Sequence, residues 1–214
     1  MRPFRLAVLV SGEGSNLQAI LDSVHGREGI DVACVGASRP DARALERARE
    51  AGVPTGVFAA SDHSDRAVRD EALAEFLIAH DVDLVVLAGF MELLDPAFVR
   101  RFDGRMINVH PSLLPAFPGV RAIEQALDYG VRVTGVTVHF VDEGVDTGAI
   151  VAQAAIELPY APDIARVEEM VHAVEHRLLP EAIRLIARGG VRIEPAEPGA
   201  RRRVNLEREP NGER

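Results

Sequence analysis

An asparagine and a histidine separated by one residue form the most chemically suggestive pair in this sequence. Asn108 and His110 follow an apolar approach, Met106 to Val109, which is typical of a buried strand. Side chains two positions apart in a strand point to the same face, so the two polar groups would project together. Pro111 ends that strand. An amide donor beside an imidazole suits acyl chemistry, although both residue types are also common at strand ends as turn formers.

A glycine-rich turn near the amino terminus is a second candidate site. It reads Ser-Gly-Glu-Gly-Ser-Asn over residues 11–16, between an apolar run and a helical pattern. Backbone amides of Gly14, Ser15 and Asn16 at a helix start would bind an anion. The dinucleotide fingerprint is incomplete, because Leu17 replaces its third glycine and no acid ends the second strand. A phosphate monoester is therefore the expected ligand, and a tight turn capped by Ser15 or Asn16 is the alternative.

Acidic residues crowd the segment after a later apolar strand. Asp142, Glu143 and Asp146 are solvated turn residues on the simplest interpretation. If one of them reached His110, it would orient the ring and raise its basicity. His139, within that strand, is expected to be a packed side chain.

A histidine-rich segment late in the chain spells H-x-x-E-H from His172 to His176. The two histidines would share one helix face, which resembles a zinc motif. No third ligand is apparent elsewhere, so we expect no metal site.

Composition limits the remaining classes. The chain has 214 residues, 47% of them hydrophobic, enough for one large domain. A net charge of −9 disfavours a nucleic-acid partner, and no apolar run is long enough to span a membrane. The single cysteine, Cys34, excludes an internal disulfide and fits a cytoplasmic location.

Strand and helix patterns alternate along the chain, which predicts an α/β fold with a doubly wound, mostly parallel sheet. Two longer strand patterns, 133–141 and 149–158, are joined by a short loop and should form an antiparallel pair. Residues 163–188 are helical, with a kink or break at Pro180. We expect one domain over 1–190, followed by a strand and a disordered tail over 191–214.

Four motifs, taken in order, resemble the phosphoribosylglycinamide formyltransferases of purine synthesis, within the folate-dependent formyltransferases. They are the turn at 11–17, Ala-Gly-Phe-Met at 88–91, Asn-Val-His-Pro-Ser-Leu-Leu-Pro at 108–115, and Val-His-Phe-Val at 138–141 leading to Asp146. The resemblance runs from about residue 6 to residue 180. It implies a Rossmann-like formyltransferase fold and formyl transfer from 10-formyltetrahydrofolate to the amine of glycinamide ribonucleotide. These two small molecules are the implied partners, without a metal.

The resemblance also implies residue roles. Asn108 would donate to the oxyanion, His110 would assist proton transfer, and Asp146 would pair with His110. The substrate phosphate would be held by Gly14, Ser15 and Asn16, and its ribose by Glu175. The folate would lie against Arg66, Met91, Glu92, Leu94, Val141, Asp142 and Glu143.

Two positions depart from the family pattern. Glu92 stands where many members have arginine, and Arg121 where many have histidine. Hydrolysis of 10-formyltetrahydrofolate without an acceptor, and a catalytically silent folate- or nucleotide-binding protein, are the alternative functions. A homodimer is compatible with the sequence, which does not define the oligomeric state.

Overall fold

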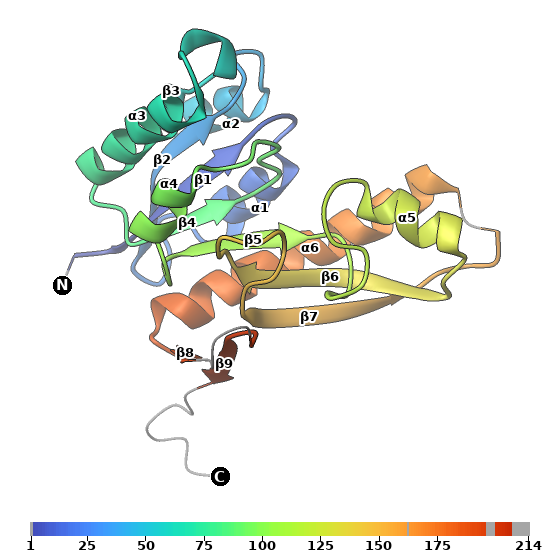
Figure 1. Cartoon of the computed structure of the whole chain (residues 1–214). Helices are drawn as coiled ribbons and strands as arrows, with labels where there is room; N and C mark the ends of the chain where they lie inside the picture. The colour runs from blue at the N-terminus through green and yellow to red at the C-terminus, as the bar shows by residue number, and fades with distance from the viewer. Residues whose placement is uncertain (1, 162, 196–199, 207–214) are drawn as a thin grey trace.

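A computed structural model describes residues 2–161, 163–195 and 200–206. Its centre is a seven-stranded sheet with the order β3-β2-β1-β4-β5-β6-β7 (Figure 1). The strands are β1 Phe4–Val10, β2 Ile30–Ala37, β3 Thr55–Val57, β4 Leu84–Leu87, β5 Met106–His110, β6 Val133–Phe140 and β7 Ile150–Glu157. β1 to β5 pair in parallel, whereas β6 runs antiparallel to both β5 and β7. The doubly wound, mostly parallel sheet and its antiparallel pair are confirmed.

Helices cover both faces of the sheet, which explains why the inner strands are almost continuously apolar. One core cluster joins the sheet to α1, α2 and α6, and the other joins it to α3 and α4. The helices are α1 Ser15–Ser23, α2 Ala44–Glu50, α3 Arg66–Ala79, α4 Pro96–Arg101, α5 Ala122–Tyr129 and α6 Ile164–Ala187, with a 3₁₀ turn, η1, at Ala60–Asp62. No helix in the described part of the chain is both long and apolar enough to cross a membrane.

The strand order reverses between β1 and β4, and ligands of such sheets bind beyond the carboxyl ends of the strands at this point. The Ser11 hydroxyl connects the loops there. It accepts from the Met91 backbone N–H at 2.8 Å and lies 2.7 Å from the Ser38 hydroxyl. Three strand ends are thus tied together around one serine.

Two details differ from the sequence analysis. α6 continues through Pro180 without a break, since its packing against α1 and the sheet stabilises it. The residue that caps α1 is Gly14, not the Ser15 or Asn16 of the alternative interpretation.

The carboxyl-terminal segment contains a second strand where the sequence predicts a disordered tail. β8 Val191–Glu194 pairs in antiparallel fashion with β9 Arg203–Leu206. The rest of the predicted tail, 196–199 and 207–214, lies outside the described residues. The hairpin lies below β7, beyond the end of α6 (Figure 1).

Candidate active site

Asn108 and His110 lie at the end of β5, as the apolar approach and Pro111 predict. Pairing with β6 sets Asn108 opposite His139 and His110 opposite Thr137. His110 is buried, with 4% of its surface exposed, and Asn108 is partly buried. Both residues therefore lie on β5, which pairs in parallel with β4 on one side and in antiparallel fashion with β6 on the other.

Both ring nitrogens of His110 face oxygen atoms. Nε2 lies 2.9 Å from the Phe117 carbonyl oxygen, and Nδ1 lies 3.4 Å from Oδ2 of Asp146. A carbonyl can only accept, so Nε2 carries the proton, and Nδ1 is the atom at which the ring gains or loses one. Burial lowers the pKa of His110, although the Phe117 carbonyl and the Asp146 carboxylate both favour the protonated ring.

Asp146 is the member of the acidic segment that reaches His110. Its Oδ2 also accepts from the Gly119 backbone N–H at 2.7 Å, and its backbone is left-handed with φ 54°. Burial alone would raise the pKa of Asp146, but the facing His139 ring and the Gly119 N–H outweigh burial and lower the pKa below its ordinary value. The carboxylate thus stays ionised beside the imidazole.

His139 belongs to the same cluster, which the sequence prediction of a packed side chain missed. Its Nδ1 donates to the Phe140 carbonyl at 2.8 Å, so Nε2 accepts when the ring is neutral and donates toward Asp146 when the ring is protonated. That Nε2 lies 3.3 Å from Nδ2 of Asn108 and 3.5 Å from Oδ1 of Asp146. His139 therefore orients the Asn108 amide with its nitrogen toward the cluster. Its position opposite Asn108 in the antiparallel pair is the signal that could have identified it.

The glycine turn closes tightly against a second helix. Gly14 has φ 75°, and a Cβ there would meet the Ala44 Cβ at 2.6 Å. No other residue type fits both the backbone conformation and this contact. The amino end of α1 thus begins at Ser15 with its first N–H groups unpaired within the helix, which favours an anion.

Glu175 of α6 reaches the start of α1 and is buried, with 5% exposed. Its Oε2 accepts from Nδ2 of Asn16 at 2.9 Å. Burial raises the pKa of Glu175, although the Asn16 hydrogen bond opposes this shift. Oδ1 of Asn16 is buried and has no hydrogen-bond partner among the described residues. The pair can therefore both accept and donate toward a hydroxylated ligand.

Two cavities flank the end of β5 and both include Glu92. The larger, about 740 Å³, is lined by the glycine turn, the β4 loop and α6: Ser11, Gly12, Glu13, Gly14, Ser15, Asn16, Ser38, Arg39, Ala88, Gly89, Met91, Glu92, Val109, Pro111, Ile123, Glu168, Val171, His172 and Glu175. The smaller, about 190 Å³, is lined by Leu87, Phe90, Glu92, Leu93, Leu94, Pro96, Val99, Asn108, His139, Val141, Asp142, Glu143, Gly144, Val145 and Asp146. Val109 and Pro111 line the first cavity and Asn108 the second, so the end of β5 lies between the two cavities.

Most predicted folate contacts meet at these cavities. Leu94, Val141, Asp142 and Glu143 line the smaller one, together with Asn108 and Asp146. Met91 lines the larger cavity instead.

Arg66 is not brought to either cavity. It is exposed and lines a separate surface hollow with His63, Arg69 and Glu92. This hollow shares Glu92 with both cavities, so Arg66 lies beyond their rim.

The two positions that depart from the family pattern have defined partners. Oε2 of Glu92 lies 3.0 Å from Nη1 of Arg69, whose side chain is buried and also pairs with Asp70 at 2.7 Å. Arg121 precedes α5 with φ 61°, is largely exposed, and lies 3.3 Å from Glu124. Glu92 is thus committed to an ion pair within the protein, whereas Arg121 lines neither cavity.

The described residues contain no group of three or more side chains able to hold a metal ion. His172 and His176 stack at 6.1 Å between ring centroids, and the intervening Glu175 turns to Asn16. The site can hold an anion at the start of α1, present an amide donor from Asn108, and move a proton between His110 and Asp146. This set of functions suits acyl transfer onto a phosphorylated acceptor.

Comparison with known proteins gives a concordant result. A family model described as formyl transferase matches residues 4–183. The glycinamide ribonucleotide transformylase 1 of Symbiobacterium toebii superposes with a TM-score of 0.90 at 47% identity, covering 96% of this chain and 95% of that one.

Curated relatives agree. Phosphoribosylglycinamide formyltransferase of Mycobacterium tuberculosis is 46% identical over 89% of this chain and 88% of its own length. The trifunctional purine biosynthetic protein adenosine-3 of Drosophila melanogaster is 45% identical, and the chain spans 14% of its length. The chain belongs to the formyl transferase family, and within it to the phosphoribosylglycinamide formyltransferases.

Proposed function

We propose that this protein transfers the formyl group of 10-formyltetrahydrofolate to the amine of glycinamide ribonucleotide, as a step of purine synthesis. The observation that carries the proposal is the convergence of Asn108, His110 and Asp146 at the end of β5, where Asn108 and Asp146 line the smaller cavity and the neighbouring Val109 and Pro111 line the larger one. The family membership and the names of the relatives support the same reaction.

The acceptor would occupy the larger cavity. Its phosphate would meet the backbone N–H groups of Gly14, Ser15 and Asn16, where the dipole of α1 favours negative charge. Its ribose hydroxyls would exchange hydrogen bonds with Glu175 and the unpartnered Oδ1 of Asn16. These contacts would direct the amine toward the end of β5.

The formyl donor would enter the smaller cavity. Leu94 and Val141 offer apolar surface for a flat ring, and the segment from Asp142 to Asp146 offers polar edges. Met91, Glu92 and Glu143 would lie along the bound molecule, with Arg66 near its tail. The Glu92 side chain is already paired with Arg69, so a negatively charged tail would have to be bound by other groups.

The reaction needs one proton moved and one oxyanion stabilised. The amine nitrogen attacks the formyl carbon, and the carbon–N10 bond of the folate breaks. Asn108 would donate its amide N–H to the oxygen that becomes negative. The Asp146 and His110 pair would take the proton from the attacking amine and deliver it to N10. His139 would hold the Asn108 amide in orientation.

The assay follows from the two substrates. The purified protein should release tetrahydrofolate and form the formylated ribonucleotide in equal amounts when both substrates are present. Release of tetrahydrofolate without the acceptor would instead support a hydrolase. Binding without any turnover, unchanged in His110→Ala, would support a silent binding protein.

Domain organisation, location and assembly belong to the same proposal. The family match over 4–183 supports one formyltransferase domain over 1–190, with 191–214 as an appended segment. The lone buried Cys34, whose pKa burial raises to about 12, fits a reducing cytoplasm. Sedimentation of the pure protein tests the homodimer.

A further inference from the structure

The loop that carries Asp146 joins β6 to β7 and is held partly by its own side chains. Oδ1 of Asp142 accepts from the Gly144 N–H at 3.1 Å and from the Thr147 hydroxyl at 2.6 Å. Gly148 packs so closely on Phe140 that an added Cβ would meet its carbonyl oxygen at 1.7 Å. Between these two points, Asp146 has a left-handed backbone with φ 54°, a conformation that aspartate tolerates better than most side chains and that neighbouring contacts can hold in place.

A single guanidinium from the carboxyl-terminal segment holds the backbone on both sides of Asp146. Nη2 of Arg201 donates to the Asp146 carbonyl at 3.0 Å, and Nε donates to the Gly148 carbonyl at 3.0 Å. The planar fork of arginine suits two such acceptors at once. Arg201 binds the carbonyl oxygens and not the carboxylate of Asp146. The carboxylate is therefore free to contact the Gly119 N–H and His110.

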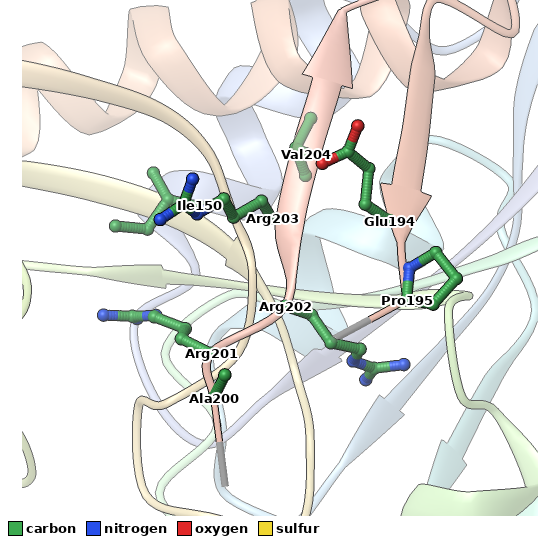
Figure 2. Close-up of a pocket in the computed structure, with 8 residues that line it drawn as sticks. All are labelled: Ile150, Glu194, Pro195, Ala200, Arg201, Arg202, Arg203 and Val204. Atoms are coloured by element: carbon green, nitrogen blue, oxygen red, sulfur yellow. The ribbon is translucent and has the colours of Figure 1, made fainter. Parts of the chain in front are cut away.

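The neighbouring residue anchors the segment to the body of the protein. Arg202 makes two hydrogen bonds to the Asp103 carboxylate, at 3.0 and 2.7 Å, in the turn between α4 and β5. Figure 2 shows Arg201 and Arg202 extending to opposite sides of the strand that leads into β9. β9 itself pairs with β8, so the segment is fixed at its strand and at Arg202 while Arg201 reaches the loop.

We propose that Arg201 is a positioning residue for the formyl transfer proposed above, which fixes the backbone of Asp146 so that its carboxylate faces His110. The inference rests on that proposed function for its effect on turnover. Its contact with the reacting groups is indirect: Arg201 touches the backbone of the Asp146 loop and no group of His110 or Asn108. This proposal gives residues 200–206 a role in the active site, namely to hold the backbone of the loop that carries Asp146.

The test compares Arg201→Gln with Arg203→Gln in the full-length chain. Arg203 is exposed, lies in the same segment, and makes no side-chain hydrogen bond or ion pair among the described residues, so it is a matched control. Arg201→Gln should lower kcat about 10- to 100-fold, since small misplacements of catalytic groups have effects of that size. The KM for the ribonucleotide should stay nearly constant, because its cavity does not include this segment.

Two further measurements separate positioning from general stability. In an Asp146→Asn background, Arg201→Gln should reduce kcat by less than about threefold, because the group through which it acts is already lost. Amide hydrogen exchange over residues 142–148 should accelerate in Arg201→Gln and not in Arg203→Gln. Arg201→Lys, which keeps the charge without the fork, should fall between the wild type and Arg201→Gln.

The outcomes are decisive in either direction. An unchanged kcat in Arg201→Gln, equal losses in both arginine variants, or full additivity with Asp146→Asn would overturn the inference, as would unchanged exchange of the loop. The exchange measurement needs no substrate. If the wild-type protein formed no formylated ribonucleotide, the proposed function would fail while the exchange result still reported on Arg201.

Discussion

The Asp146 carboxylate lies 3.4 Å from Nδ1 of His110, with only 12% and 5% of their side chains exposed. At that distance in a partly desolvated site, the charge of one group controls the proton of the other. The proposed chemistry depends on this pair. Its two residues are therefore the first targets for substitution.

Asp146→Asn should lower kcat by about 10²- to 10⁴-fold, the range of a general acid–base group. The substitution keeps an oxygen for the Gly119 N–H and removes the negative charge, so both substrates should bind with little change. Steady-state kinetics with each substrate varied in turn separates the two effects. Undiminished turnover would remove Asp146 from the mechanism.

Titration of the His110 ring by NMR should give a midpoint below the ordinary value of about 6.5, since burial lowers its pKa. Asp146→Asn should lower the midpoint further, because the carboxylate favours the protonated ring. A midpoint that rises in the variant would contradict the assignment of Nδ1 to face the carboxylate.

The same shift has a consequence for stability. Below about pH 6.5 the unfolded chain protonates His110 more readily than the folded chain does. This histidine's contribution to the free energy of unfolding is therefore present at neutral pH and is lost as the pH falls toward its folded pKa. The difference in free energy of unfolding between wild type and His110→Gln, followed by denaturant titration from pH 7.5 to about 5, should shrink as the pH falls.

Gly14→Ala should destabilise the fold by about 1–3 kcal/mol through its left-handed backbone and its clash with Ala44. It should also raise the KM for the ribonucleotide, because the turn that presents the N–H groups proposed to bind the phosphate must shift. Gly12→Ala is the matched control, since a Cβ there meets no atom within 4 Å. Thermal unfolding and kinetics that fail to distinguish the two variants would argue against a built phosphate site.

Glu175→Gln should raise the KM for the ribonucleotide by about 10- to 100-fold. A change of this size corresponds to the loss of the binding free energy of one charge-assisted hydrogen bond. The ligand-free protein should become more stable at neutral pH, since burial raises the pKa of Glu175 and its ionised form is costly there. Glu168, on the exposed rim of the same cavity, supplies the control as Glu168→Gln. Loss of kcat with an unchanged KM would contradict a role in binding the acceptor.

Local sequence patterns were sufficient for the order of elements and for the end of β5. The apolar approach to Asn108, the proline after His110 and the glycine of the first turn each act within a few residues. The loop at 142–148 could be located, but which of its acids would meet His110 depends on the backbone conformation at Asp146.

The remaining features depend on long-range contacts. His139 enters the cluster only through the register between β5 and β6, because a histidine inside a strand has no local mark of function. Arg201 lies in a segment of low hydrophobicity, and its partners are carbonyl groups more than fifty residues away in sequence. Pro180 shows the opposite case, in which packing overrides a local signal that normally ends a helix.

The ion pair between Glu92 and the buried Arg69 has an evolutionary consequence. An arginine at position 92, which the family resemblance leads one to expect, would set two guanidinium groups against each other beside the rim of both cavities. Position 69 cannot simply lose its cation, because Asp70 would then be buried without its partner. Residues 69, 70 and 92 should therefore covary among relatives, so that a change at one of these positions is accompanied by a change at another.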